Sequence, residues 1–404
     1  MIKLTHSNIR ILLIASAGVG ALTLRGGSAL AQETESATTT TKLNEIVVTA
    51  NKREERLSDV GMAVTAIGGA TATIRQQLDL QDLATSVPDL SLQQGGVANS
   101  TKAVIRGENS GSDGATVATV MDDIPISFSA SNEDGAFLAT DPDTYDLNRI
   151  EVLKGPQGTL YGAVAEGGII KYVTNAPDPS AFHSGFEVGG LSIEHGGEDG
   201  SAKGYANIPL LDEKAALRIT GFYEGIPGWE DNGMLNKKDV NGGEKYGGRI
   251  SLLVQATPDL TIRATAHIQY LNTDGEDKID VQGANSPNDP FALVHGYNYY
   301  TFSPDRERSS MTIYGLNVTY NLHMAQLQSI TSYGTLGLNF LEDQPYLFAL
   351  FGPNTSTQQR QFDGLKKFNQ EVRFSSEPGS ELFGRSIEWQ TGIFYTNEQN
   401  RENQ

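Results

Sequence analysis

Beyond Pro179 the chain consists of long segments in which apolar and polar residues alternate, and this pattern restricts its fold more than any other feature. Alternation places apolar side chains on one face of a β-strand and polar side chains on the other. The segments reach or exceed the roughly 9 to 11 residues of a tilted transmembrane strand, about twice the average strand of a soluble β-sandwich. We therefore predict nine antiparallel membrane strands, at residues 184–195, 201–210, 214–226, 245–257, 260–272, 310–321, 324–338, 368–376 and 386–398.

The segment 260–272 shows the alternation most clearly. Ile262 and Ile268 fall on one face, whereas Arg263 and His267 fall on the other. Contact with lipid on one side and a polar interior on the other produces this pattern.

The connections between the predicted strands alternate in length, which orients them. The short connections are residues 211–213, 257–259, 322–323 and 377–385. The long polar connections are residues 227–244, 273–309 and 339–367. In outer-membrane barrels short turns face the periplasm and long loops face the outside, so we expect that orientation here.

The composition excludes several classes of protein. The chain has 44 Gly in 404 residues, which favours turn-rich β-structure, and it has no cysteine, which excludes disulfides and thiolate metal sites. A formal net charge of −19 argues against nucleic-acid binding. No apolar run reaches the roughly 18 to 20 residues of a membrane-spanning helix.

The N-terminus has the three parts of a secretory signal peptide. Lys3 and Arg10 supply the basic region, residues 11–24 the apolar region, and Ala29-Leu30-Ala31 the cleavage site. The alternative is an amphipathic anchor or a short core helix, which leaves the Ala-x-Ala ending unexplained. We expect residues 1–31 to be removed near Ala31, followed by a Thr- and Ser-rich tether.

A short β-branched run follows the tether: Glu45, Ile46, Val47, Val48, Thr49 and Ala50. A short strand-forming segment on a flexible tether suits pairing with the sheet edge of another protein. The alternative reading is an ordinary first strand of the domain that follows.

Residues 57–178 read as a compact α/β unit. The pattern predicts strands at 64–67, 103–106, 117–126 and 150–154, and a helix at 71–85. The glycine-rich stretch 155–168 lacks both the Gly-Lys-Ser/Thr ending of a P-loop and the Gly-x-Gly-x-x-Gly of a dinucleotide site, which argues against nucleotide binding.

The run from Arg149 to Thr174 resembles the plug-domain signature of TonB-dependent outer-membrane receptors, particularly siderophore receptors: a strand, a Gly-Pro-x-Gly turn, a short Leu-Tyr-Gly helix, a Gly-Gly turn and a final strand. The Glu45–Ala50 segment resembles the family's TonB box. The signature residues are Arg106, Gly107, Arg149, Glu151, Lys154, Gly155, Pro156, Gly158, Tyr161, Gly162, Gly167 and Gly168. Ala163-Val164-Ala165 departs from the family pattern, because many members carry a polar pair there.

The resemblance implies an α+β plug domain followed by an antiparallel transmembrane β-barrel. Since plugged barrels of this kind have 22 strands, the nine predicted here make the barrel incomplete, and we expect a truncated receptor. The expected domains are the signal peptide 1–31, a tether with TonB box 32–56, the plug 57–178 and the N-terminal part of the barrel 179–404.

The resemblance also implies a function: energy-coupled uptake of a scarce nutrient across the outer membrane of a Gram-negative bacterium. In this family the nutrient is most often a ferric siderophore, with vitamin B12, haem, nickel or oligosaccharides as other options. The implied partners are periplasmic TonB, outer-membrane lipid, the barrel-assembly machinery and an iron–siderophore or similar small ligand. The alternatives are a passive porin or adhesin, and a secreted hydrolase.

Some individual residues follow from the resemblance. The expected ligand-facing residues are Gln93, Gln94, Asn99, Ser127 and Ser129. Arg106, Arg149 and Lys154 are expected to form ion pairs with carboxylates of the barrel.

The sequence shows no clear motif for a metal site, a cofactor or catalysis. The six histidines lack metal-site spacing, no cofactor is expected, and no catalytic motif indicates an enzyme. Residues 141–146, Asp-Pro-Asp-Thr-Tyr-Asp, resemble the start of a calcium loop but lack the required Gly at Asp146 and Glu at Val152. The acidic stretch 274–280 reads as a solvated extracellular face.

Overall fold

The computed structural model describes residues 46–75, 79–94, 101–108, 115–128, 141–162, 164–211, 213–275, 301–343, 358–377, 379–382 and 385–403. Within these ranges no helix is long and apolar enough to cross a membrane. The predicted signal peptide, the tether and Glu45 lie outside the described residues. So do Asn99, Ser129, Ala163 and the acidic stretch from Glu276 onward.

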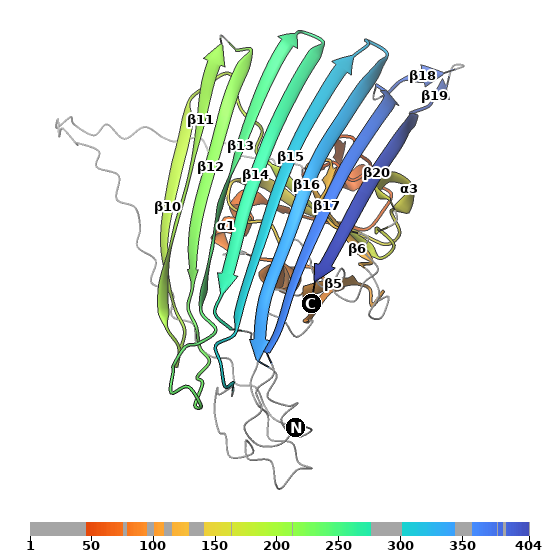
Figure 1. Cartoon of the computed structure of the whole chain (residues 1–404). Helices are drawn as coiled ribbons and strands as arrows, with labels where there is room; N and C mark the ends of the chain where they lie inside the picture. Colours follow the sequence, from red (N-terminus) through yellow and green to blue (C-terminus); the bar gives the residue numbers. More distant parts are fainter. Residues whose placement is uncertain are drawn as a thin grey trace, which may run out of the picture.

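Nine antiparallel strands form one continuous curved sheet, which we call the wall (Figure 1). Each strand pairs with the next one along the chain, and β17 pairs with β20. The strands are β10 (His183–Ser192), β11 (Glu198–Leu211), β12 (Ala215–Ile226), β13 (Gly243–Thr257), β14 (Leu260–Thr273), β15 (Arg306–Asn321), β16 (Ala325–Asp343), β17 (Gln358–Ser376) and β20 (Gln390–Asn403). The predicted nine-stranded sheet is confirmed.

The two faces of the wall differ as the alternation predicts. On β14, His267 and Gln269 are buried, with 2% and 7% of their surface exposed, whereas the intervening Ile268 and Tyr270 expose 37% and 41%. The inner face is therefore polar and covered, and the outer face apolar and open, as expected of strands that face lipid outside.

The ends of the wall also differ. Connections of a few residues join β11 to β12, β13 to β14 and β15 to β16, at the upper end in Figure 1. The same end carries a small hairpin, β18 (Glu381–Leu382) and β19 (Arg385–Ser386), between β17 and β20. By the rule for outer-membrane strands, this end faces the periplasm.

The α/β unit, which we call the plug, lies against the inner face of the wall (Figure 1). Its main sheet has the order β3-β8-β9-β6-β7, in which β6 and β9 are parallel. Beside it lie a second hairpin and three short helices. The elements are β3 (Val64–Gly68), α1 (Gly69–Ile74), α2 (Leu80–Ser86), β4 (Leu90–Gln94), β5 (Thr101–Ile105), β6 (Val117–Met121), β7 (Ile124–Pro125), β8 (Leu147–Lys154), α3 (Gly158–Tyr161) and β9 (Gly168–Thr174).

The plug has its own apolar core, which explains its compact shape. Leu83 from α2, Ile105 from β5, and Ile150 and Tyr172 from the sheet are essentially fully buried in one cluster. Burying an aliphatic side chain of this size contributes about 1.5 to 3 kcal/mol, so this cluster supplies much of the free energy that holds the plug together.

Two plug elements differ from the prediction. The helix predicted at 71–85 is two helices, because Asp79 caps the start of α2: its side chain accepts the backbone N–H of Asp82 at 2.8 Å. The strand predicted at 117–126 is instead β6 and β7, joined by a tight turn in which Asp122 has a φ of 54°. β4 was not predicted.

The wall strands are longer than predicted on the side of the long loops. β16 continues to Asp343 rather than ending at residue 338, and β17 begins at Gln358 rather than at residue 368. Their added parts pair with each other in unbroken register, so pairing continues where the alternation along each single segment weakens.

Candidate functional site

The segment with the predicted TonB box is folded against the plug at the short-connection end of the wall. β1 (Val47–Val48) pairs with β2 (Glu55–Arg56), followed by the short 3-10 helix η1 (Leu57–Asp59). Val48 and Ala50 are completely buried, while Ile46 and Val47 expose 45% and 40% of their surface. Half of the segment thus belongs to a core, as in the alternative of an ordinary first strand, and half is accessible.

Thr49 is the residue that ties this segment to the plug signature. Its backbone N–H and its hydroxyl both donate to Oε1 of Glu151, at 2.8 and 3.1 Å. Arg149 donates to the same oxygen at 2.7 Å. Glu151 is fully buried, so these three donors compensate for the cost of removing its charge from water.

Tyr161 holds the next residue of the segment. Its hydroxyl donates to the carbonyl oxygen of Ala50 at 3.0 Å, and its ring lies in the same apolar cluster as Val48 and Ala50. Burial raises the pKa of Tyr161 to about 12, so the hydroxyl remains a donor at neutral pH. Glu151 and Tyr161, two residues of the predicted signature, therefore form the docking site of the box.

The departure at residues 163–165 has a structural counterpart here. Val164 and Ala165 are buried in the cluster that covers Val48 and Ala50. Apolar residues at these two positions thus pack beneath the box.

The glycines of the signature allow the chain to turn tightly around the docking site. Gly155 has a φ of 97° and Gly162 a φ of 91°, a region that side chains rarely adopt. At Gly168 a Cβ would collide with the carbonyl oxygen of Leu153. We therefore expect substitutions at these positions to displace α3 and with it Tyr161.

The basic residues that follow the box form ion pairs with the wall. Lys52 pairs with Glu371 of β17 at 2.7 Å, and both side chains are nearly buried. Arg53 pairs with Glu388 at 3.2 Å and also donates to the carbonyl oxygen of Trp389, just before β20. The segment is thus anchored to the plug through Thr49 and to the wall through Lys52 and Arg53.

A line of alternating charges connects these two anchors. Lys171 of the plug pairs with Asp123 at 3.0 Å, Asp123 with Arg373 of the wall at 3.2 Å, and Arg373 with Glu371 at 2.9 Å. Burial alone would raise the pKa of Asp123, but the charges of Lys171, Arg373 and Lys52 outweigh it and hold this pKa well below the ordinary value. Plug, wall and box therefore share one ion-pair network.

A second set of ion pairs fixes the plug to β11–β14. Asp146 of the plug accepts from Arg218 at 2.5 and 2.8 Å and from the hydroxyl of Thr220 at 2.8 Å, and Arg249 donates to its backbone carbonyl at 2.9 Å. The further pairs are Asp143–Lys203 at 3.4 Å, Asp141–Lys245 at 3.6 Å and Asp122–Arg263 at 3.3 Å. In every one of these pairs the plug supplies the carboxylate and the wall the cation.

This polarity corrects the prediction for Arg106, Arg149 and Lys154. Arg149 pairs with Glu151 and Lys154 with Asp89 at 3.5 Å, both within the plug, and Arg106 is an exposed turn residue with a φ of 55°. The plug presents carboxylates where it meets β11–β14, whereas Arg149 and Lys154 form their ion pairs within the plug.

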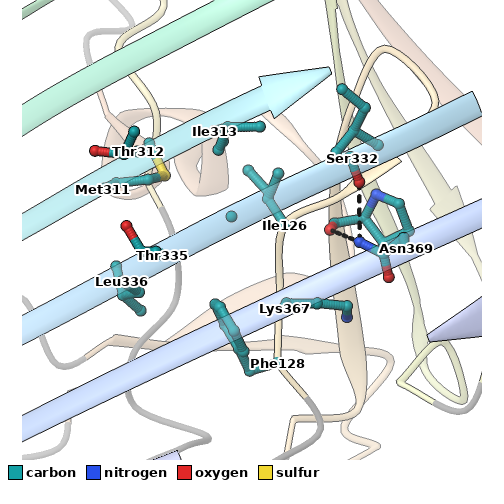
Figure 2. Close-up of a pocket in the computed structure, with 13 residues that line it drawn as sticks. Ile126, Phe128, Met311, Thr312, Ile313, Ser332, Thr335, Leu336, Lys367 and Asn369 are labelled. Carbon is teal, nitrogen blue, oxygen red and sulfur yellow. Dashed lines mark hydrogen bonds between the residues drawn. The ribbon is translucent and has the colours of Figure 1, made fainter. Parts of the chain in front are cut away.

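A third contact between plug and wall is apolar. Ile126 and Phe128, which follow β7, pack against Met311 and Ile313 of β15 and Leu336 of β16, around a hollow of about 10 Å³ (Figure 2). Beside it, Asn369 donates to the hydroxyl of Ser332 at 3.0 Å. This contact covers the part of the wall next to the ion-pair network.

Of the predicted ligand-facing residues, the structure describes Gln93, Gln94 and Ser127. Ser127 is 6% exposed, its hydroxyl accepts the N–H of Thr119 at 3.1 Å, and its carbonyl accepts from Lys367 of the wall at 2.6 Å. It therefore lies at the contact between plug and wall, and its assignment as ligand-facing stays a prediction. Gln93 is exposed on β4, which Gln94 ends.

Sequence reasoning missed the wall-binding residues altogether. The sequence suggests only an incomplete calcium loop at residues 141–146, and its patterns assign no role to Lys52 or Arg53. A signal did exist for the wall partners: Arg218, Arg249 and Arg263 occupy inward positions of otherwise alternating strands, where a cation needs a carboxylate opposite.

Comparison with known proteins agrees with this architecture. Residues 56–169 match the family described as the TonB-dependent receptor plug domain. The chain is 28% identical over 203 residues to the vitamin B12 transporter BtuB of Vibrio vulnificus, covering 50% of this chain and 30% of that protein. It is 33% identical over 129 residues to the hemin receptor of Yersinia pestis, covering 32% and 18%.

Among solved structures, the ferric yersiniabactin uptake receptor FyuA from Yersinia pestis superimposes with a TM-score of 0.69 at 18% identity, covering 86% of this chain and 50% of that one. The chain thus spans about half the length of this receptor and a smaller share of the curated relatives. The predicted fold, a plug followed by part of a barrel, is confirmed, and the location is the outer membrane of a Gram-negative cell. The plug of this chain, residues 56–169, belongs to the TonB-dependent receptor plug-domain family.

Proposed function

We propose that this chain is part of an energy-coupled importer in which residues 45–50 are passed to a periplasmic TonB protein. The observation that carries the proposal is the double anchoring of this segment, to the plug through Thr49 and to the wall through Lys52. Both anchors are polar, so water or a partner can replace their hydrogen bonds. The apolar contacts that release would also break are those of Val48 and Ala50.

The exposed edge of the segment supports this role. β1 has only two residues and its partner β2 two more, so few backbone hydrogen bonds hold it. Ile46 and Val47 present accessible apolar side chains at the periplasmic end of the wall. A partner strand that added to this segment would gain main-chain hydrogen bonds and these side-chain contacts together.

Removal of the segment would alter the contacts of the plug as well. Glu151 would lose two of its three donors, and Glu371 would keep only Arg373. The remaining pairs of the network can then rearrange between plug and wall. A pull on the segment would in this way reach the plug directly, as energy-coupled transport requires.

We propose a ferric siderophore as the substrate, with haemin and vitamin B12 as the competing classes. The supporting observation is the likeness in fold to a receptor named for ferric yersiniabactin, whereas the two curated relatives are named for vitamin B12 and hemin. We also propose that residues 1–31 are removed on export, and that 32–56, 57–178 and 179–404 are tether, plug and barrel.

The test expresses the complete receptor that contains this chain, in a Gram-negative host that lacks its own siderophore receptors, and measures uptake of radiolabelled iron under iron limitation. Deletion of residues 45–50, and separately Val47→Pro, should abolish uptake while leaving the protein in the outer membrane. Ile74→Ser, a change at an exposed apolar plug residue, serves as the control and should leave uptake unchanged.

The same assay separates the proposal from a passive porin or adhesin. Uptake that persists after the deletion and rises in proportion to external concentration would favour the porin. Parallel assays with ferric siderophores, haemin and cobalamin identify the substrate class, and uptake of cobalamin or haemin alone would overturn the siderophore assignment while leaving energy coupling intact.

A further inference from the structure

One buried side chain holds the connection between plug and wall. Residues 175–182, which we call the exit, join β9 of the plug to β10 of the wall. Asn207 of β11 is completely buried and binds the backbone of the exit. Its Oδ1 accepts the N–H of Asp178 at 2.8 Å, and its Nδ2 donates to the carbonyl oxygens of Asp178 and Ala181, both at 2.8 Å. The side-chain amide thus uses its carbonyl and its NH₂ group on the exit.

The exit has a stiff backbone at the point where Asn207 binds it. Pro177 and Pro179 lie on either side of Asp178 and restrict the backbone φ angles there. Because proline has no N–H, the single backbone donor of this Pro-Asp-Pro run is the one that Asn207 accepts. The carboxylate of Asp178 also accepts the N–H of Ser180 at 2.8 Å, which folds the exit back on itself. Asn207 therefore binds a preformed turn.

Along the exit the hydrogen-bond partners change from the plug to the wall. The side-chain Nδ2 of Asn175 donates to the carboxylate of Asp146 at 2.9 Å and to its carbonyl oxygen at 3.2 Å, so Asn175 is held by the plug. Three positions later Asp178 is held by Asn207 of the wall. Residues 176–177 therefore mark the boundary between the part of the exit that is fixed to the plug and the part that is fixed to the wall.

The opposite end of the plug is held less firmly. The segment with the predicted TonB box lies partly open, since Ile46 and Val47 expose 45% and 40% of their surface. Its β1 and the partner strand β2 have two residues each. Asn207, in contrast, is fully buried, so detaching the exit would leave donors and acceptors without partners before water could reach them. A pull from the periplasm would therefore release the box before the exit.

We propose that Asn207 is a positioning residue that fixes the exit of the plug on the wall. This proposal rests on the energy-coupled function proposed above. A pull on residues 45–50 then turns the plug about residues 176–177, as a hinge motion, and displaces it from one side. Without the hold at Asn207, the same pull would draw the plug away from the wall as a whole and leave a passage for unrelated solutes.

The first test measures leakage through the complete receptor that contains this chain, as sensitivity of the host cells to vancomycin, which is too large for ordinary porins. Asn207→Ala removes three hydrogen bonds and should sensitise the cells about tenfold. Asn207→Asp keeps the shape of the side chain but removes its donors, and should sensitise them too. Deletion of residues 45–50 in either variant should abolish the leak, because no pull then reaches the plug. Asn317→Ala, at an amide that binds Gln328 of the wall, is the control and should not leak.

The second test measures hydrogen exchange in the purified receptor and does not depend on TonB. In Asn207→Ala the N–H of Asp178 should exchange about tenfold faster, while β11 and β12 keep their protection. Unchanged exchange would overturn the hold itself. A leak that persists without residues 45–50 would mean general damage to the wall and would overturn the role in coupling. Iron uptake by the unmodified receptor that ignores this deletion would instead overturn the proposed function, and the exchange rates would still decide whether Asn207 holds the exit.

Discussion

The plug meets the wall through two unlike surfaces. Towards β11–β14 the contact is ionic, with Asp146 and its neighbours inserted among buried cations. Towards β15 and β16 it includes an apolar patch in which Ile126 and Phe128 pack on Met311 and Ile313. The first surface is stabilised by pairing of opposite charges, and the second by exclusion of water from apolar side chains.

The two surfaces respond differently to separation. When an ionic contact opens and water enters, each charge regains its hydration, so the net cost of opening is small. When an apolar contact opens, each Å² exposed costs about 25 cal/mol with nothing regained. We infer that, when the plug is displaced, its ionic contacts with β11–β14 separate first and its apolar contacts with β15 and β16 separate last.

The largest effect should come from leaving buried cations without their carboxylate. Asp146→Asn keeps the shape of the side chain and tolerates the φ of 58° at this position. It removes the charge that faces Arg218 and Arg249, and breaking such a buried pair should lower the free energy of unfolding by about 3 to 5 kcal/mol. Urea unfolding of the detergent-solubilised protein, followed by tryptophan fluorescence, measures the change.

A double variant checks the cause of this loss. Arg218→Met in the Asp146→Asn background removes the unpaired cation and should restore part of the stability. Asp59→Asn, which breaks a surface pair with Arg56, should change little. If Asp146→Asn behaved like Asp59→Asn, the ionic surface would contribute nothing and the comparison would fail.

The apolar surface should give the next largest effect. Ile126→Ala deletes buried methyl groups that face Met311 and Ile313, and should cost about 2 to 3 kcal/mol, towards the lower end for such changes because a hollow already lies beside it. Raising the salt concentration should leave this loss unchanged, whereas it should weaken screened ionic contacts. A salt-dependent loss for Ile126→Ala would mean that the patch is not the apolar contact described.

The anchor of the box should respond more weakly. Lys52→Gln removes one partner of Glu371, which keeps Arg373 at 2.9 Å, so we expect a loss of only about 1 kcal/mol. The local effect should be clearer, because the box would detach from the wall more often. Limited proteolysis after Arg53 should accelerate in this variant and stay unchanged in Arg56→Gln, whose side chain is exposed; equal rates would contradict the anchor.

Much of this fold could be predicted because it depends on local patterns. Alternation over ten or more residues identifies a strand and its two faces without knowledge of its neighbours, and all nine wall strands were found in this way. The plug signature was recognised for similar reasons, since Gly155 and Gly162 are required by turns within the segment itself.

The contacts between plug and wall could not be predicted, because they join residues far apart in sequence. Lys52 and Glu371 are 319 positions apart, and no local pattern pairs them. The same holds for Asp146 and Arg218, since a carboxylate in a turn looks equally suited to solvent or to calcium. The split of residues 117–126 into β6 and β7 was missed because apolar residues continue on both sides of Asp122-Asp123, where the backbone turns.

The smallest expected effect distinguishes two carboxylates on the ionic surface by their response to pH. Burial, with the charge of Asp79, raises the pKa of Asp141 to about 6 despite the nearby Lys245. In the unfolded chain this carboxyl has its ordinary value of 3.8. Between these two values the folded protein binds the proton more tightly, so the contribution of Asp141 to stability falls as pH rises from about 4 to about 6.

Asp123 has the opposite sign, because its folded pKa lies below the ordinary value and its contribution is lost as pH falls. Asp141→Asn should therefore remove a decrease in unfolding free energy as pH rises from about 4 to about 6. Asp123→Asn should instead remove an increase in unfolding free energy as pH rises to about 4 from below. The change for Asp141 should be small, since its side chain keeps 29% of its surface exposed and solvent screens it. Urea midpoints of the two variants are measured at about pH 3, 4 and 6, so that each pH window is covered. Slopes altered in the same direction would show that the two carboxylates do not occupy opposite electrostatic environments.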